Sequence, residues 1–190
     1  MYFRACIIEL LAFVTQSRSI LPASVARERE QQLVSSARQL AGSVRTFQST
    51  WGAERMSEMT LPWISFGIAT LMNNSGDSES SESLIDLCRA ERLFCDRWMV
   101  SKGIFRMFQL SVSHLGIGIP HEVRILFDDF EKQHWGRTDP SVFRSCFPNH
   151  LMLLADGKLT VEGEMDNFLS KWEKVTVTQS ADYVSGEQGG

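Results

Sequence analysis

Cysteine and histidine are the residues of this sequence best suited to metal or nucleophilic chemistry, but their spacing argues against a metal site. The sequence holds four of each, at Cys6, Cys88, Cys95, Cys146, His114, His121, His134 and His150. A structural zinc site draws on closely spaced ligand pairs such as C-x-x-C, and no such pair occurs. No two histidines have the i, i+4 spacing of a helical metal site. The sequence therefore predicts neither a metal ion nor a cofactor.

Two of the cysteines, Cys88 and Cys95, lie seven residues apart and so share one face of a predicted helix. Their Cα atoms would be roughly 10 Å apart, which is too far for a disulfide bond. We expect reduced thiols that pack as small apolar groups, as is typical of an intracellular protein.

One acidic run, "FDDFEK" at Phe127–Lys132, is similar to the motif with which all-α isoprenoid synthases bind magnesium diphosphate. That motif needs a third carboxylate four residues after the first, where this chain has Lys132. A solvated acidic face is the simpler interpretation. The sequence also contains no G-x-S-x-G elbow and no glycine-rich phosphate loop. We therefore predict no catalytic residue and no enzymatic activity.

The bulk composition describes a globular chain of about one domain. The 190 residues are 43% hydrophobic and 22% charged, with a formal net charge of −4. Such a chain offers no basic field to a nucleic-acid backbone, so we expect no direct binding of nucleic acid. The apolar N-terminal run faintly resembles a secretory signal, but Glu9 interrupts it and it is too short to span a bilayer. A buried helix in an intracellular protein is the preferred interpretation, with no membrane partner.

Apolar residues recur at helical spacing along most of the chain. The expected helices cover residues 2–14, 24–51, 61–72, 83–98, 102–115 and 121–135, and a short one is expected over 162–172. No convincing alternating segment occurs outside Val175–Val177. The sequence therefore predicts an all-α bundle of about six helices with a poorly structured C-terminal tail.

The second helix has the clearest stripe, formed by Leu33, Ala37, Leu40, Val44, Phe47 and Trp51. The stripe predicts that the ring of Trp51 is largely buried and that Arg38 lies on the wet face. Gly52 follows directly, where a left-handed residue would end the helix. The next helix, opened by Pro62, is apolar nearly all round and includes Trp63, so we expect it to be central and buried.

The segment "NNSGDSESSES" is rich in serine and acidic residues and predicts an exposed, mobile loop. A capping box at Ser83–Asp86 would begin the fourth helix. The apolar face of that helix comprises Leu84, Leu87, Cys88, Phe94, Cys95 and Trp98. Glu91 falls on the same face, so its carboxyl group must snorkel, pair with an arginine or raise its pKa.

Several sequence blocks resemble the regulatory region of fungal transcription factors that carry an N-terminal binuclear zinc cluster. The blocks are A-R-x-x-A-x-x-V-R-T-F, W-G-x-x-R-M, a P-W helix, C-R-A-x-R, K-G-x-x-R-M-x-Q, and P-x-E followed by L-F-x-x-F-E. They extend from Ser35 to Trp135, about half of the chain. The nearest subgroup is that of nitrogen-assimilation and secondary-metabolite regulators. The resemblance implies a helical regulatory domain, nuclear localisation and protein partners of transcriptional regulation, with a homodimer as one option.

The chain departs from that family in what precedes these blocks. The six-cysteine zinc cluster that binds DNA is absent, and so is the early half of the helical region. The expected organisation is a divergent helix and loop over 1–34, a core resembling the fungal regulators over 35–135, and an irregular extension over 136–190. The chain therefore resembles a truncated relative, a fragment or a divergent gene product, without its own DNA-binding module.

The resemblance gives "WGAERM" the role of a sharp corner between two packed helices. Trp51 would close the stripe, Gly52 would permit the reversal, Arg55 would cap helix carbonyls and Met56 would fill the gap. The residues singled out for a structural or interaction role are Trp51, Gly52, Arg55, Met56, Trp63, Glu91 and Arg106.

Three functions remain open from the sequence. The first is a non-catalytic regulatory or interaction domain of a fungal transcription factor. The second is an independent all-α enzyme or small-ligand binder with a site between helices, whose first candidates are Glu91, Cys88, Arg106 and His114. The third is a degenerate product without a stable activity. A polar pocket that converges on Glu91 would favour the second.

Overall fold

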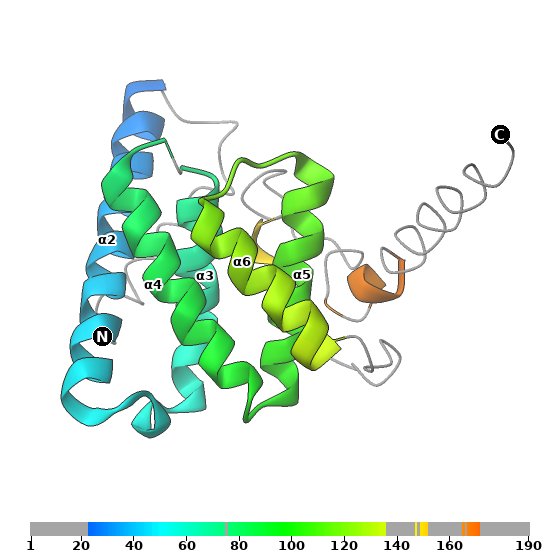
Figure 1. Ribbon diagram of the computed structural model, residues 1–190. Coiled ribbons are helices and arrows are strands. Elements are labelled where there is room, and N and C mark those ends of the chain that lie inside the picture. The colour runs from blue at the N-terminus through cyan, green and yellow to red at the C-terminus, as the bar shows by residue number, and fades with distance from the viewer. Residues whose placement is uncertain are drawn as a thin grey trace, which may run out of the picture.

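The computed structural model describes residues 23–74, 76–135, 147, 149–151, 165 and 167–171, and every element in this part is helical. The order is α2 (Ala23–Trp51), the 3-10 helices η2 (Ala53–Arg55) and η3 (Glu58–Thr60), α3 (Leu61–Met72), α4 (Ser78–Cys95), α5 (Met99–Leu115), α6 (His121–Phe130) and the π-helical turn η4 (Glu131–Trp135). The all-α prediction is confirmed (Figure 1). The helix predicted over 2–14, Cys6 and Cys146 lie outside the described residues.

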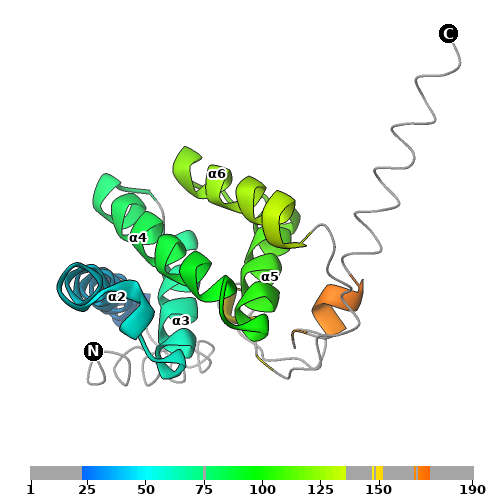
Figure 2. The same cartoon turned by 60° about the horizontal axis from the view of Figure 1, so that its bottom comes forward.

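Helix α4 is the centre of the bundle, because it packs against α2, α3, α5 and α6. Figure 2 shows it between α2 on one side and α5 and α6 on the other. Helix α3 is buried nearly all round, as predicted, and Trp63 is one of its few half-buried residues. A Cβ atom at Gly67 of α3 would lie 2.8 Å from a methyl group of Leu87 and 3.2 Å from one of Leu40. The glycine therefore allows α3 to approach both α4 and α2 closely.

The stripe of α2 enters the core only along part of the helix. Its early members, such as Leu33, Ala37 and Val44, are buried, but the side chain of Trp51 is 57% exposed. The prediction that the Trp51 ring is buried is therefore wrong. Helical spacing identifies the face of a helix but not the point at which its neighbours end, and Met56 closes the core at this end instead.

Helix α4 begins earlier than predicted. Its first residue is Ser78 and its N-cap is Asp77, whose side chain accepts a hydrogen bond from the backbone N–H of Ser80. The predicted loop is therefore largely helical, Ser83 lies inside the helix, and Ser80 and Ser83 are buried. Composition suggested a loop because serine and aspartate favour turns, yet the same residues are also the preferred N-caps.

The start of α5 differs from the prediction, whereas its end agrees with it. Trp98 was predicted on the apolar face of the fourth helix, but α4 ends at Cys95 and Trp98 is the exposed N-cap residue of α5. At the other end, α5 stops at Leu115, as predicted, and Gly116 adopts the left-handed conformation with a φ of 63°. Helix α6 begins at His121, as predicted, and Pro120 is its N-cap residue.

Residues near the C-terminus add to the core where the structure describes them. The side-chain amide of Asn149 donates a 2.8 Å hydrogen bond to the hydroxyl of Ser111 on α5. The ring of His150 packs edge-on against Phe66 of α3 and against Phe147, with centroids 5.2 and 5.4 Å away. The helix predicted over 162–172 is helical at the described positions, Met165 and 167–171. No helix of the described part is long and apolar enough to cross a membrane.

Candidate functional site

The four residues predicted to form a site between helices do not come together in one. Glu91 and Cys88 lie inside α4 and are fully buried, whereas His114 is exposed in the last turn of α5. Arg106 is buried and belongs to a separate contact between α5 and η4. Neither the groove beside α2, described below, nor a shallow notch beside Leu93 of α4 includes any of the four.

The carboxyl group of Glu91 is enclosed without a polar partner. The residue is 0% exposed, and neither carboxylate oxygen has a hydrogen-bond partner. Burial raises its pKa well above the ordinary value, so of the three options predicted for this residue the structure adopts the third. Burial also raises the thiol pKa values of Cys88 and Cys95, both of which are free. Thiols of this kind are inert as nucleophiles.

Arg106 fastens α5 to the π-helical turn that follows α6. Its guanidinium donates to Oε1 of Gln109 at 2.7 Å and lies 3.3 Å from the carboxylate of Glu131. The side-chain amide of Gln109 donates to the same carboxylate at 2.8 Å. The guanidinium also lies over the ring of Trp135, 5.6 Å from its centroid. These contacts satisfy the buried charge through packing and pairing, so Arg106 has a structural role.

A second arginine, Arg92, fastens α4 to the same turn. It donates to Asp96 at 3.1 Å and to the side-chain oxygen of Gln133 at 3.0 Å, and it also contacts the ring nitrogen Nε2 of His134. Burial, followed by the charge of Arg92, lowers the pKa of His134. A neutral imidazole can accept a hydrogen bond from the guanidinium, so the contact is consistent with that shift.

The corner after α2 is built from glycine and from an arginine that the sequence did not point to. Gly52 has a positive φ of 85°, as predicted, but its ψ of 148° is extended rather than left-handed helical. Met56 is buried, as predicted. The carbonyl groups of Ala53 and Glu54 accept hydrogen bonds from Arg97 at 3.1 and 2.6 Å.

The capping role predicted for Arg55 is therefore wrong. Arg55 lies in η2 and is exposed, while Arg97 reaches the corner from the turn between α4 and α5. The two arginines are 42 positions apart in the sequence, so only the tertiary structure reveals which of them faces the carbonyl groups.

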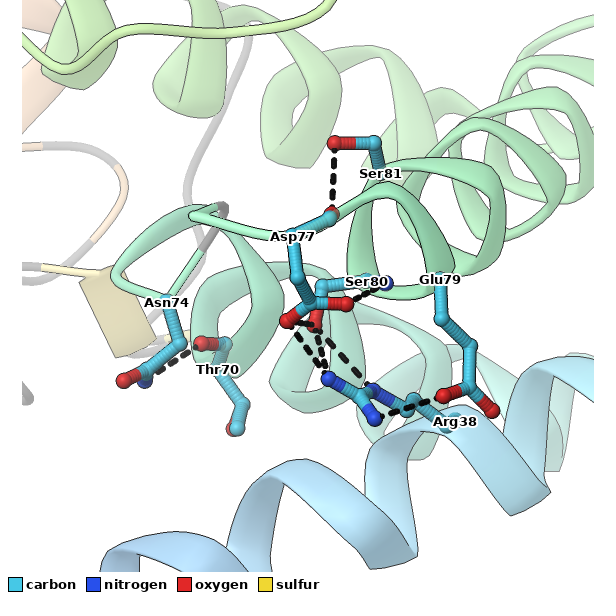
Figure 3. Close-up of polar contacts among 7 residues, drawn as sticks. All are labelled: Arg38, Thr70, Asn74, Asp77, Glu79, Ser80 and Ser81. Carbon is cyan, nitrogen blue, oxygen red and sulfur yellow. Dashed lines mark hydrogen bonds and ion pairs between the residues drawn. The ribbon is translucent and has the colours of Figure 1, made fainter.

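The densest polar cluster joins α2 to the start of α4 and is centred on Arg38 (Figure 3). The Arg38 guanidinium lies 2.6 Å from the carboxylate of Asp77 and 2.8 Å from that of Glu79. It also donates to the hydroxyl of Ser80 at 2.9 and 3.1 Å. We call this set the Arg38 clamp: Arg38, Asp77, Glu79 and Ser80.

The Arg38 clamp corrects the prediction that Arg38 is a solvated residue on the wet face. The side chain is only 25% exposed, because the first turn of α4 covers it. The hydrogen bond from the Ser80 backbone also lowers the pKa of Asp77, which therefore remains ionised as the partner of Arg38. The positive charge of Arg38 and the negative charges of Asp77 and Glu79 were the one feature of the sequence that could have indicated this contact.

An open groove of about 670 Å³ lies beside the Arg38 clamp. Its lining residues come from α2 and from the turn between α3 and α4: Arg27, Glu30, Gln31, Val34, Ser35, Arg38, Asn73, Asn74, Gly76 and Asp77. The volume is within the range of small-molecule sites, but those are mostly apolar, whereas this lining is mostly polar. The amides of Asn73 and Asn74 donate to carbonyl groups of α3 itself.

The described residues contain no group of three or more potential ligands that could hold a metal ion. Comparisons with protein-family models, with curated proteins and with solved structures found no match to this chain. The likeness to fungal zinc-cluster regulators therefore rests on the sequence blocks alone. What the geometry adds is the position of each block residue in the fold.

Proposed function

We propose that this chain is a regulatory or interaction domain related to those of fungal zinc-cluster transcription factors, and that it acts in the nucleus through protein contacts. It works without catalysis and without a metal or cofactor of its own. The DNA-binding module belongs to a longer chain or to a partner. The domain relays a metabolic signal or a partner contact to that module.

One observation supports this proposal above the others. The polar residues of the matching blocks are used to hold helices together: Arg92 of C-R-A-x-R, Arg106 and Gln109 of K-G-x-x-R-M-x-Q, and Glu131 of L-F-x-x-F-E. Their contacts lie in one region, where α4 and α5 meet η4. Such blocks define an architecture rather than a reactive site, as expected for a domain whose surface is its working part.

The alternative, a small-ligand-binding domain, has the groove beside α2 in its favour. The groove is large enough for a ligand, but its richest donor, Arg38, is already paired with two carboxylates. The carboxyl group of Glu91 has no hydrogen-bond partner and lines neither the groove nor the notch, so no described pocket supports an enzymatic site there. The regulatory domain is therefore the function that we prefer.

The proposal can be tested by fusing the chain to an unrelated DNA-binding domain in a fungal reporter strain. We expect the fusion to enter the nucleus and to change reporter transcription. Arg106→Ala should abolish the change because it breaks the fastening between α5 and η4, whereas Arg124→Ala on the exposed side of α6 should not. A fusion that leaves transcription unchanged at normal protein levels would contradict the proposal. A six-cysteine module encoded in frame upstream in the full transcript would support it independently.

A further inference from the structure

The π-helical turn η4 is held to the bundle from two sides. On one side α5 binds the carboxylate of Glu131, and on the other Arg92 of α4 contacts Gln133 and His134. Turns of this kind are rare and occur frequently at functional sites. The contact with His134 is one that a proton can change, because an imidazole titrates near neutral pH.

The ring nitrogen Nε2 of His134 has two neighbours that require opposite protonation states. It contacts Nη2 of Arg92, and it lies 3.3 Å from Oδ1 of Asp96. A guanidinium only donates hydrogen bonds and a carboxylate only accepts them. The contact with Arg92 therefore requires a lone pair on Nε2, whereas a hydrogen bond to Asp96 requires a proton there. The same oxygen of Asp96 also accepts from Nη1 of Arg92 at 3.1 Å, so each of the three side chains contacts the other two.

The surroundings of the ring favour its neutral form. Burial is the largest cause that lowers the pKa of His134, followed by the charge of Arg92, while Asp96 acts in the opposite direction. Lys102 of α5 also lowers this pKa, and α6 contributes the uncharged ring of Phe130, which stacks on the imidazole with centroids 6.0 Å apart. At neutral pH the ring therefore accepts a hydrogen bond from Arg92.

The charged residues of η4 itself do not replace these neighbours. Glu131 pairs with Arg106 of α5, and the side chain of Lys132 is exposed. Among the described residues, the charged groups that act on His134 are therefore those at the end of α4 and the start of α5.

A proton that binds Nε2 from solvent would exchange the partners of the ring. The imidazolium cannot accept a hydrogen bond, and it repels Arg92 because both groups are then cations. It can instead donate to Asp96, whose oxygen already lies 3.3 Å away. Nη2 of Arg92 also donates to Gln133 at 3.0 Å, so its withdrawal from the ring would break that contact as well. The side chain of His134 is 17% exposed, which gives solvent protons access to it.

We propose that Arg92, Asp96 and His134 form a proton-operated latch between α4 and η4, which is closed while the imidazole is neutral and opens when His134 binds Asp96 instead of Arg92. This inference goes beyond the proposed function and does not depend on it. Opening frees Gln133 from α4, while Arg106 keeps η4 attached to α5. The latch therefore loosens one side of the turn and leaves the rest of the bundle folded.

Titration of the His134 ring by NMR in the full chain, from about pH 8 to 5, tests the latch. We expect the pKa of His134 to rise in Arg92→Gln and to fall in Asp96→Asn. These opposite shifts follow because Arg92 is the partner of the neutral ring and Asp96 that of the charged ring. Arg124→Gln removes an exposed arginine of α6 and should leave the titration of His134 unchanged.

Hydrogen exchange of the η4 amides measures the opening itself. Protection factors, which correct for the intrinsic effect of pH, should fall by about fivefold for residues 133–135 when His134 is protonated, the effect of about one lost hydrogen bond. His134→Gln keeps an acceptor near the position of Nε2 but cannot gain a proton, so its protection should not depend on pH. His121→Gln, at the exposed start of α6, should keep the dependence of the wild type.

Two results would overturn the latch. One is a pKa of His134 that shifts in the same direction in Arg92→Gln and Asp96→Asn, or in neither. The other is wild-type protection of η4 that stays constant while the ring titrates. The side chain of Asp96 is 49% exposed, so Asp96→Asn decides the first comparison if Arg92→Gln does not fold.

Discussion

Arg38 on α2 lies 2.6 Å from Asp77, and Asp77 is itself the residue that caps the N-terminus of α4. The Asp77 carboxylate thus binds to two helices. It accepts a hydrogen bond from the backbone N–H of Ser80 in α4, and it pairs with the guanidinium of Arg38 in α2, 39 positions earlier. The start of α4 is therefore defined by a tertiary contact as well as by its own cap.

Removing Asp77 or its partner Arg38 should destabilise the fold by a moderate amount. We expect Asp77→Ala to lower the free energy of unfolding by about 1–2 kcal/mol, because it removes both the cap and the ion pair. Arg38→Ala should cost about 1 kcal/mol and speed the exchange of the Ser80 and Ser81 amides. Arg45→Ala is the matched control, since Arg45 is more exposed and pairs with Asp86 at 3.3 Å. Equal stability of Arg38→Ala and Arg45→Ala in urea melts would show that the clamp contributes nothing.

The corner after α2 should depend on its glycine and not on its tryptophan. At a φ of 85°, Gly52 occupies a region that residues with a Cβ atom rarely adopt, so we expect Gly52→Ala to cost about 1–3 kcal/mol. Trp51→Ala should change stability by less than about 1 kcal/mol because the side chain is mostly exposed. Thermal melts of the two variants provide the measurement. A larger loss for Trp51→Ala would mean that the ring is packed in solution.

Glu91 should make stability depend on pH at pH values above the ordinary pKa of a carboxyl group. Its pKa is raised in the folded state. At pH values below the pKa of glutamate in the unfolded chain, the group is protonated in both states and does not reduce stability. As the pH rises, the unfolded chain loses this proton first and stability falls by up to about 1.4 kcal/mol per pH unit. Glu91→Gln should remove this slope and raise the melting temperature at neutral pH. Glu82→Gln makes the same charge change at an exposed position of α4, and it should change neither the slope nor the melting temperature.

A loss of stability in Glu91→Gln, with the slope intact, would indicate that the carboxylate has a charged partner in solution. The comparison with Glu82→Gln separates this result from a general effect of reducing the net negative charge.

His150 should act in the opposite direction, at acidic pH. Burial lowers its pKa to about 4, and its Nδ1 atom has no hydrogen-bond partner. Above about pH 6.5 the ring is neutral in both states, and below it the unfolded chain gains a proton first. Stability should therefore fall between about pH 6.5 and 4, by up to about 3 kcal/mol. His150→Phe, measured as a difference from wild type, should flatten this decline, and His121→Gln at an exposed position should not.

Duplex DNA should not bind tightly to this chain alone. The chain has a formal net charge of −4, so it has no net positive charge with which to attract the DNA backbone and displace its counterions. We therefore expect no salt-resistant complex in fluorescence anisotropy at roughly physiological salt. A defined duplex that bound tightly with a small dependence on salt would contradict this expectation.

The helices and most of the core could be predicted because local spacing determines them. The stripe through Leu33, Ala37 and Val44 identified the buried face of α2, and the predicted bounds 102–115 and 121–135 match the end of α5 and the start of α6. These signals act within one or two turns of helix, so a single sequence contains them in full.

The contacts that fasten the helices could not be predicted in the same way. Arg38 pairs with the residue that caps Ser78–Ser83, and Arg97 caps the corner after α2, and each arginine is about forty residues from the segment that it contacts. Nothing local distinguishes Arg97 from Arg55, which was the wrong choice. The exposure of Trp51 likewise depends on where neighbouring helices end, which its spacing does not report.

Three of the four arginine contacts that hold helices together also close loops of nearly equal length. Arg38 to Asp77, Glu54 to Arg97 and Arg92 to Gln133 span 39, 43 and 41 positions, and each loop has one end on or beside α4. Closing such loops costs similar entropy, because that cost grows only slowly with length. The first two loops overlap through α3, whereas the third shares only the end of α4. Because Arg106 and Gln109 of α5 also hold Glu131, breaking the third loop alone leaves α6 attached, and α6 should open only when the contacts of both arginines with η4 are lost.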